Sequence, residues 1–109
     1  MIDSAQLQRM YRLLGLGVRG RGVVVGVSQV REAAKRNNVF LAVVAMDASA
    51  NSVDKIVPLL NARRVRFIEV PSATELGAAV GRDSTAVVGI VDRQLAAGVQ
   101  DAVSREEDV

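Results

Sequence analysis

The stretch VVVGVSQVREA, residues 23–33, decides the fold, because a short apolar run stops at a glycine and a helical pattern begins at once. Gly26 carries no Cβ, so another backbone can approach closely there. The first amides of the following helix have no partner within the helix, and an uncapped helix start suits phosphates, other anions and polar base edges. Ser28 and Gln29 lie on the first turn of this helix. We therefore expect a binding surface at this junction.

Outward from the junction, apolar spacing predicts alternating strands and helices. The run VFLAVVA, residues 39–45, is continuously apolar, which is typical of a central strand covered on both faces. Alternation of this kind predicts an α/β fold, a three-layer α/β/α sandwich with a mostly parallel or mixed sheet of about four strands. The expected strands cover residues 23–25, 39–45, 65–70 and 86–91, and the helices that follow them cover about residues 26–36, 51–62, 72–80 and 92–103.

Polar residues and glycines mark the ends of the predicted helices. In the N-terminal helix, Asp3 with Gln6 predicts a capping pair, and Gly15 is the expected stop. In the third helix, Asn51 and Asp54 are placed to cap the start.

The length and composition predict one non-enzymatic domain. We expect it to cover residues 1–109, with the N-terminal helix over 1–12 and a frayed acidic tail over 104–109. The sequence has no cysteine and no histidine, which removes thiol chemistry and the commonest general base. The serines and aspartates show no catalytic arrangement, and no metal or other cofactor is expected. Because no transmembrane run and no signal-peptide pattern is present, we expect a cytoplasmic protein.

The net charge of +2 conceals an uneven distribution. Residues 1–40 contain seven basic and two acidic residues, whereas residues 99–109 contain one basic and four acidic residues. Of the 14 basic residues only Lys35 and Lys55 are lysine. Arginine suits bidentate phosphate contacts better than lysine does, although a GC-rich genome produces the same enrichment. The basic charge is therefore concentrated in the N-terminal third.

Residues 15–20, GLGVRG, match the pattern G-x-G-x-x-G, but a helix precedes them and a strand follows them. The dinucleotide-binding motif requires the reverse order, so that the pyrophosphate meets a helix start. We therefore interpret residues 15–22 as a flexible, closely packed loop. Arg19 and Arg21 in this loop could reach a phosphate backbone, or they could simply be solvated.

The second helix carries a polar stripe opposite its buried side. Such a stripe is ordinarily just a solvated face. Here it begins at a glycine whose presence a close ligand would explain, and it lies in the most basic part of the chain. We therefore interpret it as the front of an RNA-binding surface. The members of the stripe, at helical spacing, are Ser28, Arg31, Glu32 and Lys35.

Several short pieces occur in a characteristic order along the chain. They are LLGL at residues 13–16, the helix start at Gly26, LAVVAMDAS at 41–49, Val65, Pro71, ELG at 75–77, Gly81 and AVVGI at 86–90. This order resembles the ribosomal protein L-seven-Ae family, which binds kink-turn RNA, and within it the short bacterial YlxQ-type proteins. The resemblance implies an α/β/α sandwich with a four-stranded mixed sheet. It also implies an RNA surface made by the start of the second helix and the loop before the last strand.

The resemblance further implies which residues bind RNA. The family's helix start reads Gly-x-(Asn/Lys)-(Glu/Gln)-x-x-Lys; Gly26 and Gln29 match it, and Ser28 is a shorter hydrogen-bonding version. Glu32 stands where the family has lysine, and its carboxylate is expected to weaken kink-turn binding by repelling phosphates. The loop before the last strand lacks the family's apolar residue, so Arg82 could stack on a base instead. The expected RNA-binding residues are Gly26, Ser28, Gln29, Arg31, Glu32, Lys35, Arg19, Arg21, Arg82, Ser84 and Thr85.

The expected function is recognition of structured RNA, of the kink-turn or ribosomal kind, by a chain favoured to be a monomer. Ribosomal or transcription-factor proteins are further candidate partners. Two alternatives stay open. One is a protein-interaction module of the translation or transcription machinery that has lost strong kink-turn binding, as Glu32 and the acidic tail suggest. The other is a small-ligand module that uses the glycines of residues 15–20.

Overall fold

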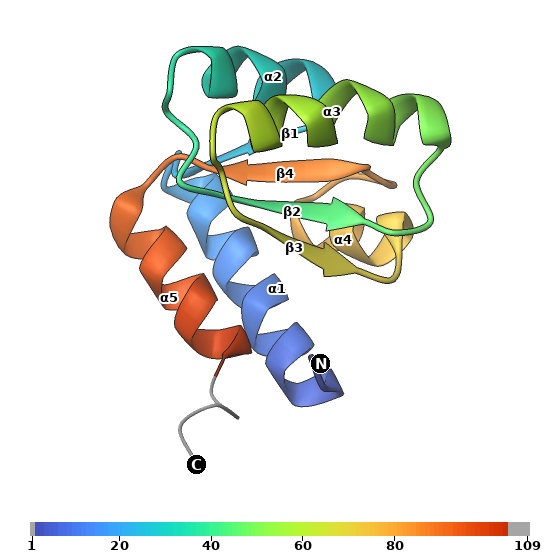
Figure 1. Ribbon diagram of the computed structural model, residues 1–109. Coiled ribbons are helices and arrows are strands. Elements are labelled where there is room, and N and C mark those ends of the chain that lie inside the picture. Colours follow the sequence, from blue (N-terminus) through green and yellow to red (C-terminus); the bar gives the residue numbers. More distant parts are fainter. Residues whose placement is uncertain (1, 105–109) are drawn as a thin grey trace.

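The computed structural model describes residues 2–104, which form five helices and four strands in strict alternation (Figure 1). The strands after the first are shorter than the apolar runs predicted, because residues such as Val39 are buried beside the sheet without pairing in it. In chain order the elements are α1 (Ser4–Arg19), β1 (Val23–Val25), α2 (Val27–Lys35), β2 (Leu41–Ala45), α3 (Ala50–Ala62), β3 (Phe67–Val70), α4 (Ala73–Ala79), β4 (Val87–Ile90) and α5 (Arg93–Val103).

The four strands form one mixed sheet in the order β1-β4-β2-β3. β4 pairs antiparallel with both β1 and β2, and β2 pairs parallel with β3. Helices α1, α4 and α5 cover one face of the sheet, and α2 and α3 cover the other (Figure 1). The predicted three-layer α/β/α sandwich with a four-stranded mixed sheet is confirmed.

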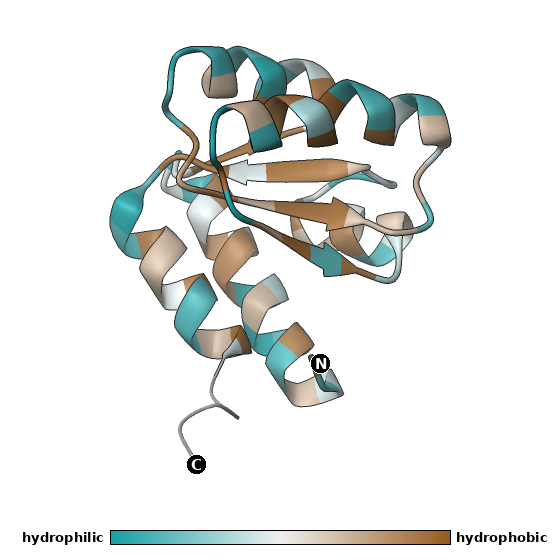
Figure 2. Ribbon diagram, viewed as in Figure 1, coloured by the Kyte–Doolittle hydropathy of each residue, from teal (hydrophilic) through white to brown (hydrophobic). Residues whose placement is uncertain are grey.

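Each face of the sheet has its own apolar core. All five residues of β2 are buried, as predicted for a central strand that is covered on both faces. Leu14 and Leu76 pack on one face, and Val30 and Leu60 pack on the other. Figure 2 shows apolar residues on the strands and polar residues along the outer sides of the helices. The polar side of α2 therefore faces outward, as the candidate surface requires.

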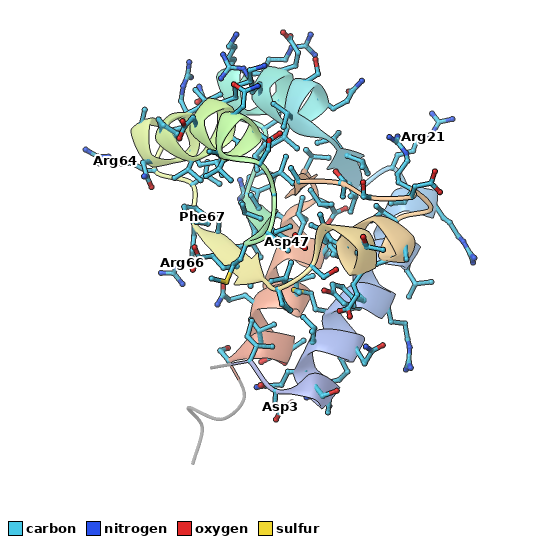
Figure 3. All side chains as sticks on the ribbon, turned by 90° about the vertical axis from the view of Figure 1, so that its right-hand side faces the viewer. Asp3, Arg21, Asp47, Arg64, Arg66 and Phe67 are labelled. Carbon is cyan, nitrogen blue, oxygen red and sulfur yellow. The ribbon has the colours of Figure 1, made fainter. Side chains whose placement is uncertain are left out.

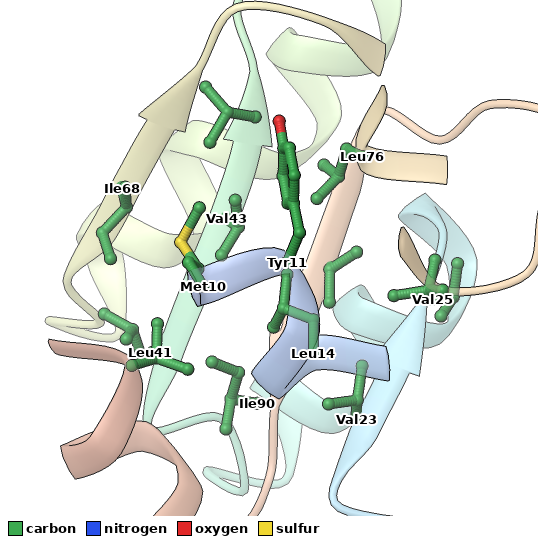
Figure 4. Packing of buried hydrophobic residues seen from close by; sticks show 14 of the residues in the cluster. Met10, Tyr11, Leu14, Val23, Val25, Leu41, Val43, Ile68, Leu76 and Ile90 are labelled. Carbon is green, nitrogen blue, oxygen red and sulfur yellow. The ribbon is translucent and has the colours of Figure 1, made fainter. Parts of the chain in front are cut away.

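Tyr11 is the aromatic residue of the core beneath α1 (Figure 4). Its hydroxyl is buried, and it has no hydrogen-bond partner among the described residues. Burial, with a smaller contribution from the carboxylate of Glu75, raises the pKa of Tyr11 above its ordinary value. The hydroxyl therefore stays neutral at physiological pH, and we assign Tyr11 to packing.

α1 is longer than predicted, because Gly15 does not end it. The helix continues to Arg19 and ends at Gly20. A Cβ on Gly17 would overlap Leu95 Cδ2 and lie 2.7 Å from Val23 Cγ2, so neighbouring elements pack directly on the helix backbone. Most of the G-x-G-x-x-G motif is therefore a packed helical turn, and the prediction of a loop is wrong for residues 15–19. Residues 20–22 form the connection to β1, and the predicted close packing is confirmed.

The helix caps agree with the sequence at α1 and differ at α3. Asp3 and Gln6 form the predicted capping pair, with both reciprocal hydrogen bonds at 2.8 Å. α3 is capped by Ser49, whose hydroxyl accepts a hydrogen bond from the Ser52 N–H at 3.2 Å. The predicted caps at positions 51 and 54 are wrong because the helix begins one residue earlier than expected.

Among residues 2–104, no helix combines the length and the apolar character needed to cross a bilayer. The acidic tail predicted over residues 104–109 lies outside the described residues, apart from Ser104.

Candidate nucleic-acid interface

The start of α2 is open to solvent and has no side-chain cap. Gly26 is the N-cap residue, with φ 94° and ψ 158°, and no side chain accepts a hydrogen bond from the first turn. Nothing lies within 4 Å of the position that a Cβ on Gly26 would occupy. The first amides of the helix therefore remain available to an outside acceptor, and the helix dipole favours negative charge at this end.

The loop before β4, residues 81–86, lies beside this helix start. The Gly26 N–H donates a hydrogen bond to the carbonyl oxygen of Val87, the first residue of β4, at 3.0 Å. Arg82 and Ser84 in the loop are exposed. The structure thus brings together the two segments expected to form one surface.

The loop is held against α4 by close backbone contacts. A Cβ on Gly77 would lie 2.7 Å from both the backbone N and C of Ser84. The Thr85 N–H donates to the carbonyl oxygen of Ala73, and the Thr85 hydroxyl donates to the carbonyl oxygen of Val87, both at 3.0 Å. The Thr85 side chain is buried. Its hydroxyl therefore shapes the loop, and its side chain is not displayed to an RNA as those of Arg82 and Ser84 are.

The exposed side of α2 presents three polar side chains around its first two turns. Ser28 lines a groove between α2 and α3, whereas Gln29 lines a hollow on the other flank, beside Val24 of β1. Glu32 lines both depressions. The carboxylate thus lies between the two depressions on the exposed side of α2.

Two arginines near Glu32 contact other residues of the chain. An Arg36 guanidinium nitrogen lies 3.7 Å from a Glu32 carboxylate oxygen, and both side chains are exposed. Arg31 donates a hydrogen bond to the carbonyl oxygen of Lys55 and so ties α2 to α3. Lys35 is exposed at the far end of the groove. Sequence reasoning missed Arg36, although the i,i+4 spacing of Glu32 and Arg36 is the signal for such a pair.

The structure does not bring Arg21 to the start of α2. Arg21 precedes β1 and Gly26 follows it, so about 16 Å of extended chain separates them. Arg21 is an exposed turn residue with φ 62°. Arg19 lies in the last turn of α1, where its positive charge complements the negative end of the helix dipole. Arg21 thus lies in the turn between α1 and β1, within the loop that the sequence predicted, whereas Arg19 belongs to the helix.

The chemistry of this surface is hydrogen bonding and charge attraction. Among residues 2–104, no group of three or more carboxylates gathers in a way that could hold a metal ion. The surface offers backbone amides, two exposed serine hydroxyls, one carboxamide and several cations, which are groups that bind phosphates and base edges. It also carries the Glu32 carboxylate, which repels phosphates.

Sequence comparison places the chain among known proteins. Residues 8–99 match the ribosomal protein L7Ae/L30e/S12e/Gadd45 family. The chain belongs to this family. RNA-binding protein YlxQ of Bacillus subtilis (strain 168), which is similar to this chain, is 31% identical over 86 residues, covering 79% of this chain and 86% of the relative. The resemblance inferred from the sequence pattern is confirmed.

Solved structures agree with this family membership at the level of the fold. A protein of unknown function from Bacillus halodurans has a TM-score of 0.80 at 24% identity, covering 88% of this chain and 97% of its own. The Giardia lamblia 15.5kD RNA binding protein has a TM-score of 0.78 at 19% identity, covering 97% of this chain and 91% of its own. At these identities the likeness concerns the fold alone.

Proposed function

We propose that this chain binds structured RNA through the start of α2 and the loop before β4, in the cytoplasm and without a chemical step. The open helix start at Gly26 carries the proposal, because a phosphate or a base edge can reach the free amides there. The Bacillus subtilis relative and the Giardia lamblia protein are both named as RNA-binding proteins, which supports it. The lack of histidine and cysteine supports recognition without catalysis.

A sharply bent RNA, such as a kink-turn, is the proposed target. Its shape allows one strand to meet the helix start while the other approaches the loop at residues 81–86. Ser28 and Gln29 then contact base edges, and Arg82 and Lys35 hold phosphates. Phosphate contacts position the protein in such complexes, and base contacts give specificity.

Anisotropy titrations with a kink-turn RNA, and with the same duplex made straight by deleting the kink nucleotides, test this function. We expect the wild-type chain to prefer the bent RNA. Its affinity should fall steeply between about 50 and 200 mM salt, because phosphate contacts release counterions. Equal binding to both RNAs, or no binding to either, would contradict the proposal.

The double substitution Ser28→Ala and Gln29→Ala is expected to lower the affinity for kink-turn RNA by about tenfold to a hundredfold, because good base-edge contacts contribute about 1–3 kcal/mol. A matched control, Ser4→Ala with Gln94→Ala, removes the same groups from exposed sites on α1 and α5. The control should bind like the wild type. If both double variants bind equally well, Ser28 and Gln29 do not face the RNA.

A protein-interaction role is the second candidate, and Glu32 is the observation that favours it. Its carboxylate lines both depressions on the exposed side of α2. A negative charge at that place opposes phosphates but suits a basic protein partner. Changing the charge at position 32 therefore distinguishes RNA binding from binding of a basic protein.

The substitution Glu32→Lys is expected to raise the affinity for kink-turn RNA by on the order of tenfold at low salt, because it removes a repulsive charge and adds an attractive one. It also releases Arg36 from its ion pair. The control Asp101→Lys makes the same change on α5, on the opposite face of the sheet. A gain no larger than that of the control would favour the protein-partner reading.

A further inference from the structure

A basic groove lies between α1 and the last turn of α4, at the opposite end of the loop from the start of α2. Arg12, Leu16 and Arg19 line it from α1, Ala79 lines it from α4, and Gly81 lies at its end. The loop that begins at Gly81 finishes beside the start of α2. Groove, loop and helix start therefore form one continuous surface.

The two arginines stand on the same side of α1. Arg12, Leu16 and Arg19 are spaced i, i+4 and i+7, which places them in one row. The helical rise puts Arg12 and Arg19 about 10 Å apart along the axis. All three side chains are exposed. Among residues 2–104, no carboxylate lies within ion-pair distance of either arginine, so both guanidinium groups can take an outside anion.

The two helices that line the groove meet at their backbones. A Cβ on Gly15 would lie 3.0 Å from the carbonyl oxygen of Ala79, so α1 and α4 approach closely. Gly81, with φ 81°, then turns the chain out of the groove into the loop, where the exposed Arg82 follows. A continuous strand can therefore follow the chain from the groove into the loop.

We propose that this groove is a second RNA-backbone site, which holds the double-helical stem flanking the nucleotides bound at the start of α2. The proposal rests on the proposed function. Every charged group that lines the groove is positive, and phosphates recur along a duplex, so arginines at two heights can each meet one. An acidic protein segment would satisfy the charge, but it would not explain the continuity with the α2 surface.

Binding of two kink-turn RNAs tests the groove. One RNA has short stems, and in the other the flanking stem is extended by about one helical turn of duplex. The wild-type chain should bind the long RNA more tightly, by on the order of tenfold. The slope of log affinity against log salt should be steeper for the long RNA by about 1.8, which corresponds to two added phosphate contacts.

The double substitution Arg12→Gln and Arg19→Gln should remove the advantage of the long RNA and its added salt slope. The control Arg64→Asn with Arg66→Gln loses the same charge, and it should keep both the tighter binding of the long RNA and the added salt slope. Arg64 and Arg66 lie on the opposite side of the molecule from Arg21, which is in the turn that follows α1 (Figure 3). Asparagine at position 64 tolerates the positive φ of 58° found there.

The outcomes distinguish the groove from the α2 surface. A wild-type chain that binds neither RNA would overturn the proposed function itself. Equal binding of the long and short RNAs by the wild type would overturn the groove alone, as would an advantage that survives in the Arg12 and Arg19 variant. Shifts of the Leu16 and Ala79 amide resonances with a polyglutamate peptide, but not with the long RNA, would also overturn it in favour of an acidic protein partner.

Discussion

Replacing Gly77 with alanine is expected to lower the free energy of unfolding by about 1–3 kcal/mol, the usual cost of overpacking. The usual effect of this substitution is the opposite, because alanine in a helix interior raises the free energy of unfolding by roughly 0.5–1 kcal/mol relative to glycine. Gly77 lies inside α4, and a Cβ there would lie 2.7 Å from two backbone atoms of Ser84. Backbone cannot rotate aside as a side chain can, so the loop before β4 must move.

Denaturant unfolding of two glycine variants measures this effect directly. Gly98 lies in α5, and nothing lies within 4 Å of its Cβ position, so Gly98→Ala should raise the unfolding free energy by about 0.5–1 kcal/mol. Gly77→Ala should also shift the amide resonances of residues 82–85 and weaken RNA binding. A Gly77→Ala protein as stable as Gly98→Ala would show that the loop does not depend on this contact.

Replacing Gly26 with alanine is expected to cost about 1–3 kcal/mol of stability, although the space around the Cβ position is empty. The reason is the backbone: φ 94° with ψ 158° is a conformation that essentially only glycine adopts. The new methyl group would also stand in the path of an RNA strand. RNA affinity should therefore fall even under conditions where the variant is fully folded.

Gly20→Ala is the matched control for this substitution. Gly20 follows α1 with φ −88°, and its nearest Cβ contact would be an ordinary 3.8 Å. Its unfolding free energy and RNA affinity should both stay close to those of the wild type. If Gly26→Ala loses stability but keeps its full affinity for kink-turn RNA, the strand does not approach the helix start.

The layer order and the central strand could be predicted from the sequence, because they depend on local apolar spacing. The run at residues 39–45 identified β2, and the glycine at position 26 identified the start of α2. The length of α1 could not be predicted, because a glycine ends a helix or continues it according to what packs against it. At Gly17 the deciding neighbours, Leu95 and Val23, include one from the far end of the chain.

In the candidate site, too, only the features that depend on local sequence could be predicted. The exposure of Ser28 and Gln29 follows from helical periodicity, and the structure places both as expected. The internal role of Thr85 depends on hydrogen bonds to α4 and β4 that no local pattern reveals. The groove beside α4 could not be predicted for a related reason. A helix that ends at Gly15 does not include Arg19, so no sequence pattern indicated that Arg12 and Arg19 lie in one row.

The position of β4 has a consequence for how the chain folds. β1 and β2 do not pair with each other, and each pairs with β4. During synthesis the sheet therefore cannot close until residues 87–90 have left the ribosome. Pairings between such distant segments slow folding, and until they form, the apolar edges of β1 and β2 are open to aggregation or to a chaperone.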